Sequence, residues 1–296
     1  MSATNRRADP VIRVPASVGN LGPGFDTLGL ALALYLKVTV RKRVDDGQGR
    51  LVARFAEPRP AMEDGISRAF HHWPLRTARP ASLEVAVESD IPERAGLGSS
   101  AAAAVAGLRL REFSDGPRSP AEIVTAAAAL EGHPDNAAAV VFGGLTSSRV
   151  AADGHVTVAR WRWPAGWTLV IATPDVQLAT SASRRALPES VPLADAVFNL
   201  QRVALLLHAV HTRSAAEMIG ALEDRCHQPY REALVPVLRR ALALGHPDLL
   251  GVCLSGAGPS VLAVVRRDPR PIGRALAALY KREGIPCTVR LNRVHQ

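Results

Sequence analysis

The most informative segment of this sequence covers residues 92–102 and reads Pro-Glu-Arg-Ala-Gly-Leu-Gly-Ser-Ser-Ala-Ala. Its two glycines, Gly96 and Gly98, carry no side chain, so backbone N–H groups can come close to an anion. Ser99 and Ser100 then open an alanine-rich run that predicts a helix, whose N-terminus adds unpaired N–H donors. The segment therefore predicts a phosphate-binding loop, although it lacks the Gly-Lys-Ser/Thr ending of a Walker loop. A serine-capped helix behind a glycine turn is the alternative that the local chemistry leaves open.

The composition is that of a globular protein of one or two domains. The 296 residues are 47% apolar and 21% charged, which excludes a disordered, collagen-like or coiled-coil chain. The net charge is +9, and 33 of the 36 basic residues are arginine. These arginines are scattered and no aromatic residues are interleaved with them, so the charge does not indicate a nucleic-acid-binding surface.

The cysteines and the apolar stretches indicate a compartment. The three cysteines (Cys226, Cys253 and Cys287) are far apart and form no CxxC pair, so neither a zinc site nor a disulfide framework is predicted. The longest apolar stretches, residues 28–36 and 101–108, are too short to span a bilayer, and no signal-peptide pattern follows the N-terminus. We therefore expect a cytoplasmic protein that does not bind membranes.

Hydrophobic periodicity and breakers predict interleaved strands and helices, hence an α+β or α/β class. The exposed, Gly- and Asp-bearing stretch 149–167 is the best candidate for a domain boundary. Strands are expected at residues 11–14, 34–40, 83–87, 167–173, 252–254, 260–265 and 287–291, and helices at 99–112, 120–131, 194–211, 214–222, 230–244 and 272–283.

Three further segments carry ordered glycine-rich or polar patterns. Residues 14–29 read Val-Pro-Ala-Ser-Val-Gly-Asn-Leu-Gly-Pro-Gly-Phe-Asp-Thr-Leu-Gly, residues 131–138 read Glu-Gly-His-Pro-Asp-Asn-Ala-Ala, and residues 254–260 read Leu-Ser-Gly-Ala-Gly-Pro-Ser. Together with residues 92–102, they resemble the ordered motifs of the GHMP kinase family, in the form that homoserine kinases carry. Residues 180–188 and 229–232 match as well, so the resemblance covers nearly the whole chain.

The resemblance implies a two-domain α+β fold. The N-terminal domain, residues 1–160, would be ribosomal-protein-like with a β-α-β phosphate-loop unit, and the C-terminal domain, residues 161–296, would be ferredoxin-like. The implied reaction is ATP-dependent phosphorylation of the L-homoserine hydroxyl to O-phospho-L-homoserine, on the way to threonine. The implied contacts to the ATP phosphates come from Pro92, Gly96, Leu97, Gly98, Ser99, Ser100 and Ala101.

The resemblance also implies a metal pair and a catalytic strategy. Glu131 and Ser100 resemble the residues that hold Mg²⁺ in the family, and Mg²⁺ takes few protein ligands besides phosphate and water. Asn136 stands near the place where mevalonate kinases use a catalytic aspartate. The implied proton transfer goes directly to phosphate, with catalysis carried by positioning. Glu131, Ser100 and Asn136 are therefore the candidate catalytic residues.

The substrate chemistry explains the remaining polar residues. The ammonium of L-homoserine needs carboxylate or amide oxygens, and its carboxylate needs a guanidinium fork. Taken singly, each candidate has a plainer interpretation as a turn cap, a surface acid or a solvent-facing arginine; their joint occurrence in family order favours the site. The candidate substrate-binding residues are Asn20, Asp26, His133, Asp135, Arg184, Arg231 and Gly258.

Some questions stay open at this point. Relatives often carry an asparagine and an aromatic residue where Asp64 and Ser67 stand, so the adenine contacts are undecided. The alternatives are a mevalonate-type GHMP kinase, a basic nucleic-acid-binding protein that shares the N-terminal half-fold, and an inactive metabolite sensor. Mevalonate lacks an ammonium, and scattered arginines argue against nucleic acid. A homodimer is the family expectation.

Overall fold

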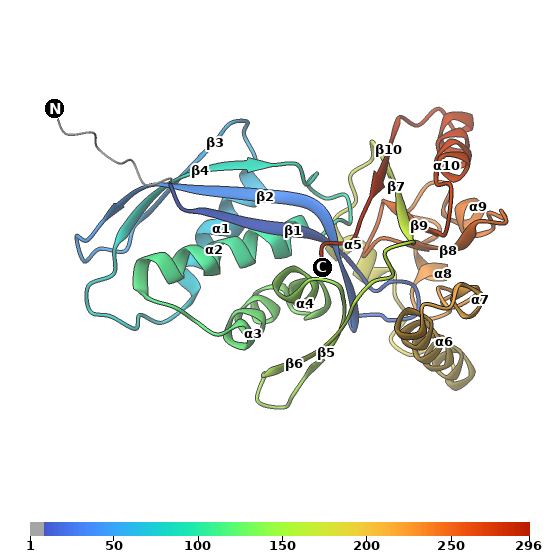
Figure 1. The fold of residues 1–296 in the computed structure, drawn as a ribbon, viewed down its shortest axis with the longest axis horizontal. Coiled ribbons are helices and arrows are strands. Elements are labelled where there is room, and N and C mark those ends of the chain that lie inside the picture. The colour runs from blue at the N-terminus through green and yellow to red at the C-terminus, as the bar shows by residue number, and fades with distance from the viewer. Residues whose placement is uncertain (1–8) are drawn as a thin grey trace.

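The computed structural model describes residues 9–296, which form two β-sheets with their helices (Figure 1). The first sheet is organised around the long strand β2 (Leu28–Val44). This strand pairs antiparallel with β1 (Val11–Gly19), β4 (Ser82–Ser89) and β5 (Leu145–Val150). At the sheet margins, β3 (Leu51–Phe55) pairs parallel with β4, and β6 (Val156–Trp161) pairs antiparallel with β5.

Four helices belong to the first sheet and gather on one side of it in Figure 1: α1 (Pro60–His72), α2 (Ser99–Asp115), α3 (Pro120–Glu131) and α4 (Asp135–Phe142). The expected helices at 99–112 and 120–131 are confirmed. Ser119 and Glu122 form a capping box at the start of α3. The sequence did not predict α1 or α4, because Gly65 weakens the helix propensity of α1 and α4 is only eight residues long.

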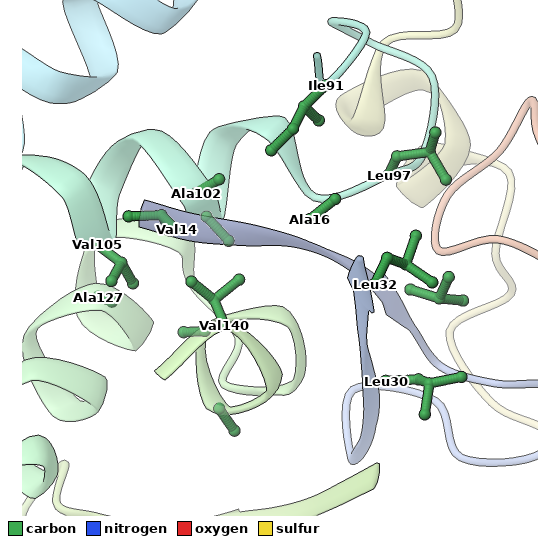
Figure 2. Close-up of a cluster of buried hydrophobic side chains, with 14 of the residues drawn as sticks. Val14, Ala16, Leu30, Leu32, Ile91, Leu97, Ala102, Val105, Ala127 and Val140 are labelled. Carbon is green, nitrogen blue, oxygen red and sulfur yellow. The ribbon is translucent and has the colours of Figure 1, made fainter. Parts of the chain in front are cut away.

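The core of this part is packed with small side chains. All residues from Ala101 to Leu108 in α2 are buried, so this helix is apolar on every side and lies between the sheet and its neighbours. Figure 2 shows Ala102 and Val105 of α2 beside Val14 of β1, with Ala127 of α3 and Val140 of α4 nearby. A Cβ on Gly107 would lie 2.3 Å from the Ile66 carbonyl oxygen, so glycine there permits the close approach of α1 and α2.

The second sheet has the spatial order β10-β7-β9-β8, and every neighbouring pair is antiparallel. With the helical segments between β7 and β8 taken as one layer, the chain order is strand, helices, two strands, helix, strand. That is a ferredoxin-like arrangement, as expected. Its strands are β7 (Thr168–Pro174), β8 (Leu249–Leu254), β9 (Val261–Val265) and β10 (Cys287–Asn292). Its helices are α5 (Thr180–Arg185), α6 (Leu193–Thr212), α7 (Ala215–Met218), α8 (Gln228–Arg231), α9 (Leu238–Leu242) and α10 (Arg270–Arg282).

The prediction of one helix at residues 230–244 is wrong. The chain forms α8 and α9 instead, because Pro236 lies between them and Val237 has a left-handed φ of 59°. The helix expected at 214–222 shortens to α7, since Ile219 is extended and Gly220 has a φ of 80°. The first sheet ends at Trp161 and the second begins at Thr168. The division at residues 160 and 161 stays a prediction.

The helix α6 was predicted, but its segment was not named among the longest apolar stretches. It is long and apolar enough to cross a membrane by length and composition, and 22% of its most apolar window is buried. One face, with Leu206, Ala209 and Val210, packs into the larger hydrophobic cluster, which contains residues of both sheets. The other exposes Leu193 at 80% and Leu200 at 69%. The helix is thus a surface element of the fold with an apolar outer stripe.

Candidate active site

Five chain connections meet in one cavity of about 280 Å³. They are the turns after β1, before α2, between α3 and α4, after β7, and between β8 and β9. All the candidate site residues line this cavity except Pro92 and Leu97. Leu97 is buried beneath it, and its carbonyl accepts a hydrogen bond from the Ser17 N–H at 3.1 Å. The sequence motifs therefore converge on one site from both sheets.

The predicted phosphate loop ends in an uncapped helix. Gly98 precedes α2 with a left-handed φ of 68°, and no side chain within residues 9–296 caps the helix, so the serine-cap alternative is wrong. The first N–H groups of α2, at Ser99, Ser100 and Ala101, therefore face the cavity region without an intrahelical partner. A Cβ on Gly98 would lie 2.1 Å from Ser17 Oγ, and one on Gly96 would lie 2.3 Å from the Ser255 carbonyl oxygen. Only glycine fits these two positions, and the arrangement suits an anion.

The candidate metal pair is assembled from two helices. Ser100 Oγ, in the first turn of α2, donates a hydrogen bond of 2.8 Å to Glu131 Oε1 at the end of α3. Both side chains line the cavity. A hydroxyl and a carboxylate are hard oxygen donors, which is the chemistry that Mg²⁺ prefers, so the pair fits this ion.

The turn after β1 presents polar groups through a strained backbone. Asn20 and Asp26 have left-handed φ values of 69° and 50°. Asn20 holds the turn closed: its Oδ1 accepts from the Asp26 N–H at 3.0 Å, and its Nδ2 donates to the Gly256 carbonyl at 3.0 Å. The Asp26 carboxylate accepts two hydrogen bonds from the Arg184 guanidinium, at 2.7 and 3.0 Å. Asp26 and Arg184 were predicted to share one site, and the structure adds that they pair directly.

The start of α4 supplies a second, buried acid. Asp135 is 1% exposed and its Oδ1 lies 2.6 Å from His133 Nδ1. Burial alone would lower the pKa of His133, but the hydrogen bond and charge of Asp135 outweigh it and raise that pKa. Asn136 is oriented by Ser17, whose Oγ donates to Asn136 Oδ1 at 2.9 Å. Asp26, His133 and Asp135 bring their ligand atoms within 4.8 Å of one another, which gathers carboxylate oxygens at this end of the cavity.

Arg231 is the most unusual charge in the cavity. Its side chain belongs to α8 and is 1% exposed. It donates to the carbonyls of Ser183 and Gly256, both at 3.3 Å, and to His227 Nδ1 at 3.0 Å. Among the described residues, no carboxylate forms a salt bridge with it and its Nη2 has no hydrogen-bond partner. Burial, with the nearby charge of Arg184, lowers the pKa of Arg231 to about 10, so the guanidinium stays charged at neutral pH.

Sequence reasoning missed part of the lining. Phe25 lies 5.5 Å from the guanidinium carbons of both Arg184 and Arg231, which is cation–π geometry. Asp64 and Ser67 are exposed in α1, and the residue that lines the cavity from that helix is Arg68. A signal existed for Arg94, which stands inside the loop motif, and for Phe25, Thr180, Gly256 and Ala257, which stand inside the other matched segments. Leu130 and Leu178, which also line the cavity, gave none.

Known proteins are similar to this chain in both sequence and fold. The family model described as GHMP kinases N terminal domain matches residues 65–144, and the one described as GHMP kinases C terminal matches residues 206–282. A homoserine kinase from Moorella thermoacetica is 40% identical over 293 residues, which cover 95% of this chain and 96% of that protein. The chain belongs to the GHMP kinase family. Membership in this family implies the use of ATP.

Other relatives agree with this family assignment. A homoserine kinase from Solibacter usitatus is 40% identical over 277 residues, covering 92% of this chain and 90% of its own. The crystal structure of a homoserine kinase from Cytophaga hutchinsonii superposes with a TM-score of 0.84 at 24% identity, covering 100% of this chain and 98% of that one. The latter similarity establishes the two-sheet GHMP kinase fold over the whole chain.

Proposed function

We propose that this GHMP kinase is an ATP-dependent homoserine kinase that acts in threonine biosynthesis. The curated relatives from Moorella thermoacetica and Solibacter usitatus are homoserine kinases that match nearly end to end. All three cysteines are free thiols, which suits the cytoplasm. The substrate assignment rests on the cavity itself.

The single observation that carries the substrate assignment is the buried Arg231, which has no salt bridge to any described carboxylate and lies near the acidic turns. A buried cation without a counter-ion is costly, and an incoming carboxylate removes that cost. The acids Asp26 and Asp135, with the Asn20 amide, offer oxygens to an ammonium. One amino acid can satisfy both ends at once. Arg184, already neutralised by Asp26, would be a secondary carboxylate contact.

The phosphate side of the cavity suits the other substrate. We assign the γ-phosphate region to the uncapped N-terminus of α2 and to the loop from Gly96 to Ala101. Ser100 and Glu131 would hold Mg²⁺, which neutralises phosphate charge when bound. The homoserine oxygen forms the new bond to the γ-phosphorus, the bond to the ADP oxygen breaks, and the hydroxyl proton passes to a phosphate oxygen. Asn136, fixed by Ser17, orients the reacting groups instead of acting as a base.

A mevalonate-type kinase fits less well. Mevalonate has a carboxylate for Arg231 but no ammonium for the acidic turns, and its tertiary hydroxyl would bring one hydrogen-bond donor and no positive charge to the buried Asp135. The test is a coupled ADP-release assay with Mg²⁺-ATP and a panel of L-homoserine, mevalonate, shikimate, galactose and no acceptor. We expect homoserine-dependent release well above the others. Release with homoserine no faster than without an acceptor would refute the proposal.

A further inference from the structure

The completely buried His227 bridges two parts of the site. It directly precedes α8, and its ring contacts two polar partners on opposite sides. Nε2 lies 2.7 Å from the Gly22 carbonyl oxygen, in the turn that carries Asn20 and Asp26. Nδ1 lies 3.0 Å from Nη1 of Arg231. The ring thus stands between the acidic turn and the buried arginine.

The two partners determine the protonation of the ring. A carbonyl oxygen can only accept, so Nε2 must carry a proton. The Arg231 guanidinium can only donate, so Nδ1 must carry a lone pair. His227 is therefore the neutral tautomer with its proton on Nε2. Burial, and secondarily the charge of Arg231, lower the pKa of His227 in agreement with this geometry, although the Asp224 carboxylate 3.6 Å away opposes the effect.

The surroundings hold this bridge rigidly. Asp224 accepts from the backbone N–H groups of His227 at 3.0 Å and Gln228 at 2.6 Å, which fixes the start of α8. Asn199 of α6 donates both to Asp224 at 2.6 Å and to the Pro23 carbonyl at 3.1 Å. The turn also comes very close to this region: a Cβ on Gly22 would lie 2.2 Å from the Leu222 carbonyl oxygen.

We propose that His227 is a positioning residue that fixes the Arg231 guanidinium relative to the Asp26 turn, so that the carboxylate and ammonium contacts of the amino-acid substrate keep one spacing. This inference rests on the proposed homoserine kinase function. With Nε and Nη1 held by Ser183, Gly256 and His227, Nη2 is the part of the fork left to meet a ligand. Loss of the Nδ1 acceptor would let the fork turn away and would leave a buried donor unsatisfied.

Two substitutions separate the two halves of the bridge. In His227→Asn, the side-chain oxygen lies near the former Nδ1 and keeps an acceptor for Arg231, whereas the Gly22 contact is lost. In His227→Gln, the amide nitrogen lies near the former Nε2 and keeps the Gly22 contact, whereas the Arg231 contact is lost. A hydrogen bond to a charged group predicts roughly a ten-fold or larger rise in the homoserine KM for His227→Gln. We expect His227→Asn to stay within about three-fold of wild type, the scale of a neutral hydrogen bond.

A merely structural defect would not change the KM for homoserine alone, so the informative measurement is the KM for homoserine compared with the KM for ATP. We expect the KM for ATP to be unchanged in both variants, with folding checked by circular dichroism. His208→Gln, at an exposed position of α6, is the matched control and should behave as wild type. Equal homoserine KM values in the two variants, or a larger rise in His227→Asn, would overturn the proposal.

A second measurement tests the geometry without any substrate. Proton–nitrogen correlation spectra of the histidine rings, with the His227 signal assigned by its loss in His227→Gln or His227→Asn, report the tautomer directly. We expect a neutral ring protonated at Nε2. A ring protonated at Nδ1 would refute the bridge to Arg231. Wild-type protein without homoserine-dependent ADP release would instead refute the proposed function, and the ring spectrum would still decide the contact.

Discussion

Replacement of Arg231 by leucine should weaken homoserine binding far more than ATP binding. The guanidinium is 1% exposed and no described carboxylate forms a salt bridge with it, so a bound carboxylate would meet it without competition from water or from another acid. A charge-assisted hydrogen bond contributes about 1.5–3 kcal/mol, which corresponds to roughly a 10–150-fold change in affinity. The burial of Arg231 places the expected loss in the upper part of that range.

Two further variants calibrate this effect. Arg231→Lys should recover only part of the affinity, because an ammonium cannot form the planar two-point contact. Arg184→Leu should cost less than Arg231→Leu, since the Arg184 side chain is 38% exposed and already paired with Asp26. Arg185→Leu, at the exposed neighbouring position, is the control and should leave homoserine affinity unchanged.

The assay is a double cycle of binding affinities with two proteins and two ligands, measured by calorimetry. The ligands are L-homoserine and 3-amino-1-propanol, which lacks the carboxylate. If Arg231 holds the carboxylate, the wild type should bind 3-amino-1-propanol much more weakly than L-homoserine. The leucine variant has already lost this contact, so it should bind the two ligands with similar affinity. Additive losses would show that Arg231 does not contact the carboxylate, and the substrate orientation proposed above would be refuted.

The metal pair, the glycine loop and the His133–Asp135 pair can each be tested by substitution. Glu131→Gln keeps the shape of the side chain but loses a charged Mg²⁺ ligand, so kcat should fall about 100-fold or more; activity within a few-fold of wild type in steady-state kinetics would make Glu131 a surface acid. Gly98→Ala would force a Cβ to 2.1 Å from Ser17 Oγ at a φ of 68°, and it should raise the KM for ATP about ten-fold. Gly154→Ala is the control, because this glycine has a φ of 83° but open space around it. It should lower the free energy of unfolding in chemical denaturation by the backbone strain alone, about 1–2 kcal/mol. The raised pKa of His133 means that its pairing with Asp135 stabilises the fold fully below the ordinary histidine pKa of 6.5 and less as pH rises through the folded value. The difference in unfolding free energy between wild type and His133→Gln should therefore be larger at about pH 5.5 than at about pH 9, and an unchanged difference would contradict the charged pair.

The sequence predicted what depends on local chemistry. Gly96 and Gly98 were identified because a phosphate loop needs positions without a side chain, and the structure leaves no room for a Cβ at either. The long helices and the alternating strands also followed from periodicity. The prediction for residues 230–244 failed because the residues on either side of Pro236 favour a helix, whereas the proline itself breaks it.

Contacts between residues that are far apart in the sequence could not be predicted. The two hydrogen bonds from Arg184 to Asp26 join positions 158 residues apart, and nothing in either local pattern specifies them. His227 was not predicted as a site residue, because a lone histidine in a polar turn is a common pattern that indicates no particular function. Its function emerges only when the Gly22 carbonyl, 205 residues away, is placed on its other side.

Strand β1 also fixes a distance across the site. Near its end, Ser17 fixes the phosphate loop through the Leu97 carbonyl at 3.1 Å and fixes Asn136 at 2.9 Å, and Asn20 begins the acidic turn three residues later. A strand advances about 3.3 Å per residue and does not stretch, and β1 continues to Gly19, so the backbone would set the span between the proposed phosphate and ammonium ends of the cavity. We expect such a site to select its substrate by length as well as by charge. Serine would keep the ammonium and carboxylate contacts, yet its hydroxyl would stop one carbon short of the phosphorus, and a misplacement of about 1 Å costs about 100-fold in rate.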